Sequence, residues 1–137
     1  MKFTYEVPGD DFSQAGFASS DIKKKLKKLN VPTPVVKRTA VAMYEAEINM
    51  VIHANGGTAE VEIFPDRIEV VMSDDGPGIE DLDLAMKEGW STASNEAREL
   101  GFGAGLGLPN MKRNSDEFSL ESTPGVGTTV RFVLHIK

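Results

Sequence analysis

Two polar residues on one predicted helix have the types and the spacing that catalysis requires. In the stretch YEAEINMVIHAN (44–55), Glu45 and Asn49 lie four residues apart and therefore share a helix face. The apolar stripe of this helix, which we expect to pack against a sheet, comprises Val41, Tyr44, Ile48 and Ile52. Glu45 falls on that stripe, where a carboxylate needs a partner because its desolvation is costly. The functional interpretation is that Glu45 orients or deprotonates a nucleophile, and the alternative is a partly exposed structural pair.

The Asn49 side chain offers a carbonyl oxygen on the same helix face. Mg²⁺ binds such hard oxygen ligands, keeps several of its waters and also binds substrate phosphates. In the functional interpretation Asn49 is therefore a magnesium ligand. His53, a further turn along, is interpreted as a hydrogen-bonded structural histidine.

The stretch GFGAGLGLPN (101–110) has a glycine at every second position, namely Gly101, Gly103, Gly105 and Gly107. It fits neither the dinucleotide fingerprint nor the P-loop, and the partner motifs of ordinary protein kinases are missing from the sequence. A glycine loop that enters a helix still offers exposed N–H groups and a favourable dipole to a phosphate. A flexible hinge is the alternative.

Two further glycine-containing turns flank predicted strands. In SDDGPGI (73–79), Asp74 ends a strand and could accept a hydrogen bond from the exocyclic amine of a purine, although a simple turn fits equally well. In GVGTT (125–129), Thr128 opens the last strand and could direct its hydroxyl inward, and a plain bend is the alternative.

The order of these motifs along residues 35–133 resembles the GHKL (Bergerat) ATP-binding superfamily, which includes DNA gyrase, Hsp90, MutL and histidine-kinase catalytic domains. The resemblance implies that ATP binds between helices and sheet, with Asp74 on the adenine amine and Asn49 on Mg²⁺. It also implies that the loop ending at Gly107 is an ATP lid. The cofactor-binding residues implied are Asn49, Asp74, Gly76, Gly78, Ile79, Gly101, Gly103, Gly105, Leu106, Gly107 and Thr128.

Within that superfamily the sequence is similar to the small bacterial serine kinases of partner-switching pathways. The similarity is carried by GPGIEDLDLAMKEGWST (76–92), by GLGLPNMKRNSDEF (105–118) and by Arg98, eight residues after Trp90. It implies that Glu45 is the general base and that Arg98 meets the terminal phosphate. The sequence departs from the pattern at Leu100–Ala104, which are extra residues, and at Glu47, where these kinases usually have a small or aliphatic residue.

The function expected from the resemblance is ATP-dependent phosphorylation of a serine or threonine on a STAS-domain antagonist protein. The alternative is a nucleotide-dependent binding module that sequesters a sigma factor or activates a PP2C-type phosphatase without phosphoryl transfer. A homodimer is a further expectation from the similar kinases. A detached histidine-kinase domain ranks third, because the sequence has only two histidines, His53 and His135, and neither lies on a dimerisation helix.

Composition limits the class of protein. The 137 residues have the length of one domain, spanning 1–137, and include no cysteine, which excludes disulfides and fits a reducing compartment. A net charge of −6 argues against a nucleic-acid partner. We find no signal peptide and no membrane span, so a cytoplasmic protein is expected. The lysines of KKKLKK (23–28) form either a solvated helix face or a docking face for an acidic partner.

The periodicity of the sequence predicts an α+β fold. The expected strands are 2–8, 59–64, 67–72, 117–122 and 128–137, and the expected helices are 19–30, 35–54, 80–89 and 106–116. Ser and Asp residues near 19–21 are the cap candidates of the first helix. Adjacent strands late in the chain favour a two-layer sandwich, in which helices cover one face of a mixed, mostly antiparallel sheet.

Overall fold

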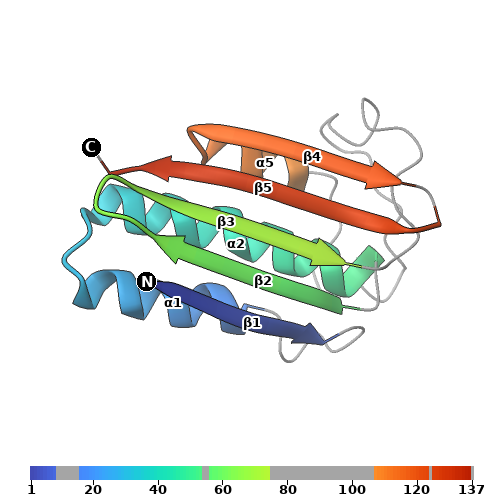
Figure 1. The fold of residues 1–137 in the computed structure, drawn as a ribbon, viewed down its shortest axis with the longest axis horizontal. Coiled ribbons are helices and arrows are strands. Elements are labelled where there is room, and N and C mark those ends of the chain that lie inside the picture. The colour runs from blue at the N-terminus through green and yellow to red at the C-terminus, as the bar shows by residue number, and fades with distance from the viewer. Residues whose placement is uncertain (9–15, 54–55, 75–106, 124, 137) are drawn as a thin grey trace.

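The computed structural model describes residues 1–8, 16–53, 56–74, 107–123 and 125–136. These residues form one five-stranded sheet and three helices (Figure 1). The strands are β1 (Lys2–Pro8), β2 (Gly56–Ile63), β3 (Arg67–Asp74), β4 (Glu117–Thr123) and β5 (Gly127–His135). The helices are α1 (Phe17–Lys28), α2 (Thr33–His53) and α5 (Gly107–Arg113).

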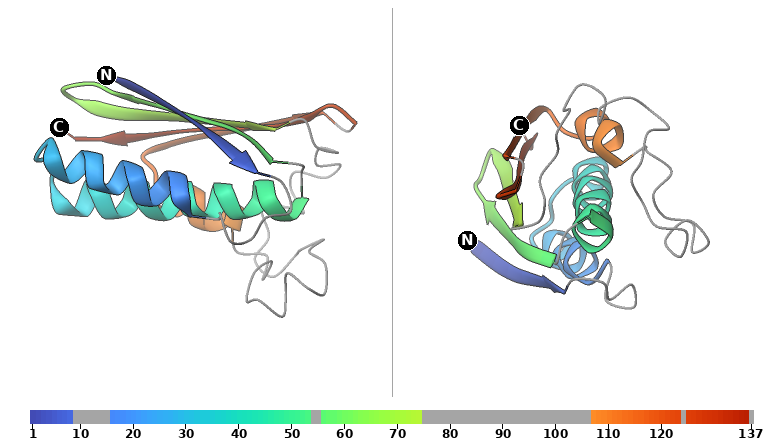
Figure 2. Two further views of the ribbon diagram at one scale, coloured as in Figure 1. Left: turned by 90° about the horizontal axis from the view of Figure 1, so that it is seen from below. Right: turned by 90° about the vertical axis from the view of Figure 1, so that its right-hand side faces the viewer.

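The sheet has the order β1-β2-β3-β5-β4, and every neighbouring pair of strands is antiparallel. All three helices lie on one face of the sheet, and α2 lies between α1 and α5 (Figure 2). The predicted two-layer α+β sandwich is therefore confirmed. The expected helix over 80–89 lies outside the described residues.

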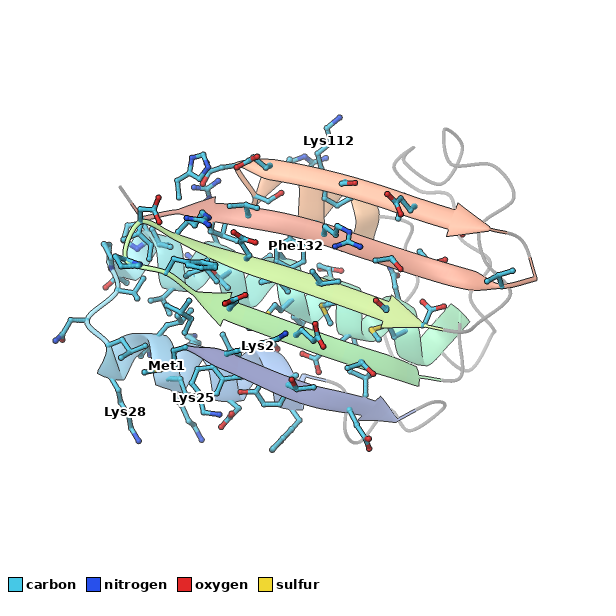
Figure 3. The ribbon with its side chains drawn as sticks, in the orientation of Figure 1. Met1, Lys2, Lys25, Lys28, Lys112 and Phe132 are labelled. Carbon is cyan, nitrogen blue, oxygen red and sulfur yellow. The ribbon has the colours of Figure 1, made fainter. Side chains whose placement is uncertain are left out.

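The core lies between the sheet and the helices because each central strand alternates buried and less buried residues. Phe132 on β5 is 1% exposed and lies near the middle of the sheet (Figure 3). The other strand residues of this core include Val61, Ile68, Val70, Met72, Val130 and Leu134. Helices α1, α2 and α5 contribute, among others, Ile22, Leu26, Val36, Met43, Met50 and Met111.

Helix α2 buries a different face from the one its apolar residues predict. Tyr44 is 39% exposed and Val41 is half-buried, whereas Ala42, Met43 and Ala46 are fully buried. The predicted stripe is therefore wrong in part, although Ile48 is buried as expected, and the side chain of Ile52 lies outside the described part of the structure. The physical reason is that α2 packs against two helices as well as the sheet, so small residues allow close approach on the sides where a single-faced helix would be polar.

Helix α1 begins at Phe17 and not at the predicted serine and aspartate caps. Its N-cap is Gly16, in the left-handed region at φ 93°, and no side chain of α1 caps it. The Glu47 carboxylate of α2 accepts the N–H groups of Gly16 at 3.1 Å, Ala18 at 3.2 Å and Ser19 at 2.7 Å. Glu47 is 2% exposed, and burial raises its pKa although the three N–H donors act to lower it. The first turn of α1 is therefore capped by a residue from another helix.

The lysine-rich part of α1 is mainly a solvated face. Lys23, Lys24, Lys27 and Lys28 are exposed, and Figure 3 shows the labelled Lys28 extending away from the fold. Lys25 differs, because its ammonium pairs with Asp21 at 2.7 Å, donates to the Tyr5 hydroxyl at 3.0 Å and lies 4.2 Å from the Phe3 ring centroid. Its contacts fix the edge strand β1 to α1.

Candidate functional site

One end of the sheet brings together two of the polar residues predicted for the site. Asp74 ends β3 and Thr128 lies at the start of β5, opposite it in the strand register. The Thr128 N–H donates to Asp74 Oδ1 at 3.3 Å. The Thr128 hydroxyl lies 2.9 Å from the hydroxyl of Ser122 on β4, so in this structure it bonds across the strand pair.

The C-terminal half of α2 reaches the same end of the sheet (Figure 1). Gly57 of β2 pairs with Asp74, and a methyl group placed on Gly57 would overlap the Ser73 carbonyl oxygen and the Met50 side chain. The same methyl group would lie 3.0 Å from the Cα atom of Asp74. Met50 directly follows Asn49 in α2, so the glycine lets the turn that carries Asn49 pack closely beside Asp74.

Glu45 and Asn49 are both half-buried on α2. Glu45 faces α5, since Asn110 Nδ2 donates to Glu45 Oε1 at 3.4 Å. Asn110 Oδ1 accepts a hydrogen bond from Arg113 at 3.2 Å. The expectation that Glu45 needs a polar partner is confirmed, and that partner comes from a neighbouring helix.

The side-chain oxygens at this end of the sheet suit a magnesium–nucleotide complex better than a metal ion held by protein ligands alone. Among the described residues, no group of three or more His, Cys, Asp or Glu side chains could hold a metal ion. Asn49 offers one neutral oxygen, and Mg²⁺ typically takes one or two protein ligands together with substrate phosphates and waters. The half-buried Asn49 and Asp74 therefore fit a site that receives its metal together with a phosphorylated ligand.

Many of the predicted site residues lie outside the described residues. They are Gly76, Gly78, Ile79, Arg98, Gly101, Gly103, Gly105 and Leu106. Gly107 is described and is the first residue of α5. Of the thirteen predicted site residues, the structure thus places Glu45, Asn49, Asp74, Gly107 and Thr128.

Two residues next to the site have roles that local sequence patterns do not predict. Glu47 looked like a departure from a pattern, and its role as the cap of α1 depends on a partner about thirty residues earlier in the chain. Asn110 gave no signal, because its partner Glu45 lies 65 residues away. Of these two residues, only Glu47 could have been noticed in the sequence, because it is a polar residue at an otherwise apolar helix position.

The fold and this end of the sheet define a class of protein, an α+β domain in which a central helix and the end of the sheet carry half-buried polar groups. Comparison with known families gives the particular one. Residues 36–137 match the family described as histidine kinase-, DNA gyrase B- and HSP90-like ATPase, so the chain belongs to this family.

Two relatives of known name cover most of the chain. This chain is 34% identical over 111 residues to the serine/threonine-protein kinase RsbT of Bacillus subtilis. The aligned residues cover 78% of this chain and 77% of that protein. It is 38% identical over 104 residues to an anti-sigma F factor of Caldanaerobacter subterraneus, covering 72% of this chain and 68% of that protein.

Solved structures support the fold. A chain in the SiaB–SiaC complex of Pseudomonas aeruginosa superposes with a TM-score of 0.65 at 14% identity, covering 96% of this chain and 88% of the other. The mycobacterial sensor histidine kinase MprB superposes with a TM-score of 0.55 at 16% identity, covering 98% and 97%. None of the helices in the described residues combines the length with the hydrophobicity that a membrane span requires.

Proposed function

We propose that this protein is an ATP-dependent serine/threonine protein kinase, contained in a single domain over 1–137, that acts in a bacterial partner-switching pathway. The observation that carries the proposal is the half-buried carboxylate of Glu45, which accepts a hydrogen bond from Asn110, on the helix that also carries Asn49. The similarity to RsbT, whose name describes a serine/threonine kinase, supports the same reaction. The proposed substrate is a serine or threonine of a STAS-domain anti-anti-sigma protein.

Glu45 acts as the general base in this proposal. The acceptor hydroxyl oxygen attacks the γ-phosphorus of ATP, the bond to the β,γ-bridging oxygen breaks, and ADP leaves. The hydroxyl proton goes to the Glu45 carboxylate. A positioned base of this kind typically contributes a factor of about 10² to 10⁴ in rate.

The other predicted site residues bind and orient the nucleotide in this proposal. Asp74 accepts a hydrogen bond from the adenine amine, and its position is fixed by strand pairing on both sides. Asn49 holds Mg²⁺, which neutralises phosphate charge when bound. Gly107 and Thr128 contact the nucleotide, and Arg98 is proposed to meet the terminal phosphate.

A labelling experiment tests the kinase proposal. The protein is incubated with [γ-³²P]ATP, Mg²⁺ and STAS-domain proteins encoded in the same genome, and label on a partner is measured with time. Glu45→Gln should reduce the rate by about 10²-fold or more. Glu121→Gln, an exposed glutamate on β4, is the matched control and should leave the rate unchanged. Full activity in Glu45→Gln would reject the base assignment.

A second candidate is a nucleotide-dependent binding module that sequesters a sigma factor or activates a PP2C-type phosphatase. It is favoured by the similarity to proteins named anti-sigma F factor. Gel filtration with the same partners distinguishes the two functions. Stable complex formation with ATP, without label on any partner, would support the binding module. The same column reports whether the protein is a homodimer, the oligomeric state that we propose.

A further inference from the structure

Asn110 links the helix α5 to the carboxylate that we assign as the general base. It lies in the middle of α5, which begins at Gly107, and it is half-buried between α5 and α2. Its Nδ2 group lies 3.4 Å from Glu45 Oε1. The two residues are 65 positions apart, so only the packing of α5 against α2 brings them together.

The orientation of the Asn110 amide follows from the chemistry of its two partners. Arg113 can only donate hydrogen bonds and lies 3.2 Å from Oδ1, so the Asn110 oxygen must face the guanidinium. The carboxylate of Glu45 can only accept when ionised, so the NH₂ group must face it. A flipped amide would place two donors together and two acceptors together. Arg113, one turn later in α5, therefore fixes the donor that points at Glu45.

We propose that Asn110 is a positioning residue for phosphoryl transfer, oriented by Arg113, and that it holds Glu45 in the geometry needed to take the acceptor proton. This inference rests on the proposed function of Glu45 as the base. By donating to Oε1, Asn110 fixes the side-chain torsions of Glu45 and assigns the second oxygen, Oε2, to the acceptor hydroxyl. The distance of 3.4 Å is long for a hydrogen bond, as is common for catalytic contacts before all substrates are bound.

The backbone around Asn110 supplies a matched control. Asn114 directly follows the last residue of α5, and its Nδ2 donates to the Asn110 carbonyl oxygen at 2.8 Å. Asn114→Ala removes an amide that bonds to the backbone of α5, and this side-chain bond of Asn114 does not involve Glu45. Any loss of activity caused by a weakened α5 should therefore appear in Asn114→Ala as well as in Asn110→Ala.

Steady-state kinetics give the first readout. Asn110→Ala should lower kcat about tenfold, the value of one hydrogen bond to a charged group, while KM for ATP stays within about twofold. Asn110→Gln, which keeps an amide donor, should recover part of the loss. Arg113→Met should lower kcat by less than Asn110→Ala, because it frees the amide to rotate without removing it. Equal kcat in Asn110→Ala and the wild type would overturn the proposal, and so would an equal loss in Asn114→Ala.

Nuclear magnetic resonance gives a second readout that needs no activity. The side-chain ¹⁵N–¹H₂ resonance of Asn110 is followed in the protein without nucleotide. It should shift in Glu45→Ala and stay in place in the control Glu121→Ala. An unchanged resonance in Glu45→Ala would show that Asn110 does not contact Glu45 and would overturn the inference. If the contact is present but no STAS-domain protein is ever labelled, the kinase proposal fails instead, so the two failures are distinguishable.

Discussion

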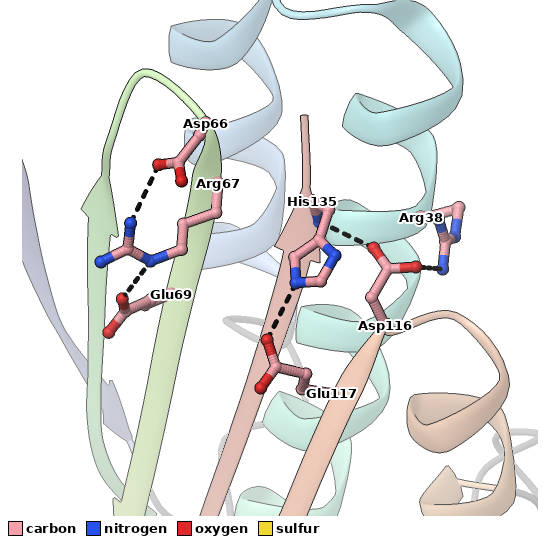
Figure 4. A network of polar contacts seen from close by, with 7 residues as sticks. All are labelled: Arg38, Asp66, Arg67, Glu69, Asp116, Glu117 and His135. Carbon is pink, nitrogen blue, oxygen red and sulfur yellow. Dashed lines mark hydrogen bonds and ion pairs between the residues drawn. The ribbon is translucent and has the colours of Figure 1, made fainter. Parts of the chain in front are cut away.

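Two aspartates bond to backbone N–H groups at opposite ends of β5, and these two hydrogen bonds differ in length. Asp74 accepts from Thr128 at 3.3 Å, near the start of the strand. Asp116 accepts from His135 at 2.7 Å, near its end, and its other oxygen accepts from Arg38 at 3.1 Å (Figure 4). The nearby pairs of His135 with Glu117 and of Arg67 with Asp66 and Glu69 make this end a dense polar network.

We propose that the Asp116 end of β5 serves stability and that the Asp74 end serves binding. The donors around Asp116, above all the His135 N–H, lower its pKa. The ionised carboxylate is therefore stabilised by contacts within the folded protein. Asp74 is held in position by the strands on either side of it, with a long hydrogen bond to one of them. In our proposal the Asp74 carboxylate, whose strand is paired on both sides, binds a ligand.

The largest effect should come from the buried carboxylate close to the site, which we assign to folding. Glu47→Ala should lower the free energy of unfolding by roughly 2–4 kcal/mol, because three N–H groups at the start of α1 lose their acceptor. Urea unfolding measures it. Glu47→Gln, which keeps one acceptor oxygen, should lose less. A Glu47→Ala protein as stable as the wild type would show that water replaces the carboxylate.

Nucleotide binding should respond next. Asp74→Ala should weaken binding of ATP about 10- to 100-fold, the value of one hydrogen bond to a charged group, with little change in stability. Isothermal titration calorimetry with Mg-ATP measures the affinity. Asp116→Ala is the matched control at the other end of β5 and should bind ATP as the wild type does. Equal affinities for ATP in the two variants would contradict the proposal that the Asp74 end of β5 serves binding and the Asp116 end serves stability.

Stability should show the reverse order at the two ends of the strand. Asp116→Ala should cost about 1 kcal/mol of unfolding free energy, since the ion pair with Arg38 is partly exposed and its hydrogen bond to His135 is charge-assisted. Asp74→Ala should cost less. Thermal denaturation of both variants in one buffer tests this, and a larger loss in Asp74→Ala would contradict it.

The smallest effects should appear in the dependence of stability on pH, with opposite signs for two carboxylates. The pKa of Asp116 is lowered on folding, so its contribution is present above the unfolded pKa and is lost as pH falls through the folded value. The pKa of Glu47 is raised by burial, so its contribution is complete below the unfolded pKa and is lost as pH rises through the folded value.

Urea unfolding from about pH 3 to about pH 7 separates these two contributions. Asp116→Asn should flatten the loss of stability on the acid side. Glu47→Gln should remove the decline that accompanies rising pH. Parallel profiles for the wild type and both variants would mean that neither group is linked to folding in this range.

Local patterns in the sequence were enough to predict most of the fold. Strand β1 was predicted with its observed bounds, and β3, β4 and β5 within about two residues, because alternation of apolar residues is a property of neighbours in the chain. The start of α1 and the buried face of α2 were not predicted correctly. Both depend on helices that pack side by side, and a residue such as Glu47 carries no local sign of which helix it will cap.

The candidate site divides in the same way. The motif order in the sequence pointed to Glu45, Asn49, Asp74 and Thr128, and the match over 36–137 confirms the family that it indicated. The structure pairs Asp74 with Thr128 through the β3–β5 register and adds Asn110 to Glu45. The roles of the residues toward ATP and Mg²⁺ stay predictions that the experiments above test.

By itself, the sequence determined which segments become strands and helices and which side chains could carry chemistry, because periodicity and residue type are encoded locally. Only the tertiary structure decided which acceptor caps α1, which face of α2 is buried and which amide positions Glu45. These choices depend on contacts between residues up to 65 positions apart. Such contacts form only when the helices pack on the sheet, because packing brings together polar groups that are far apart in the chain.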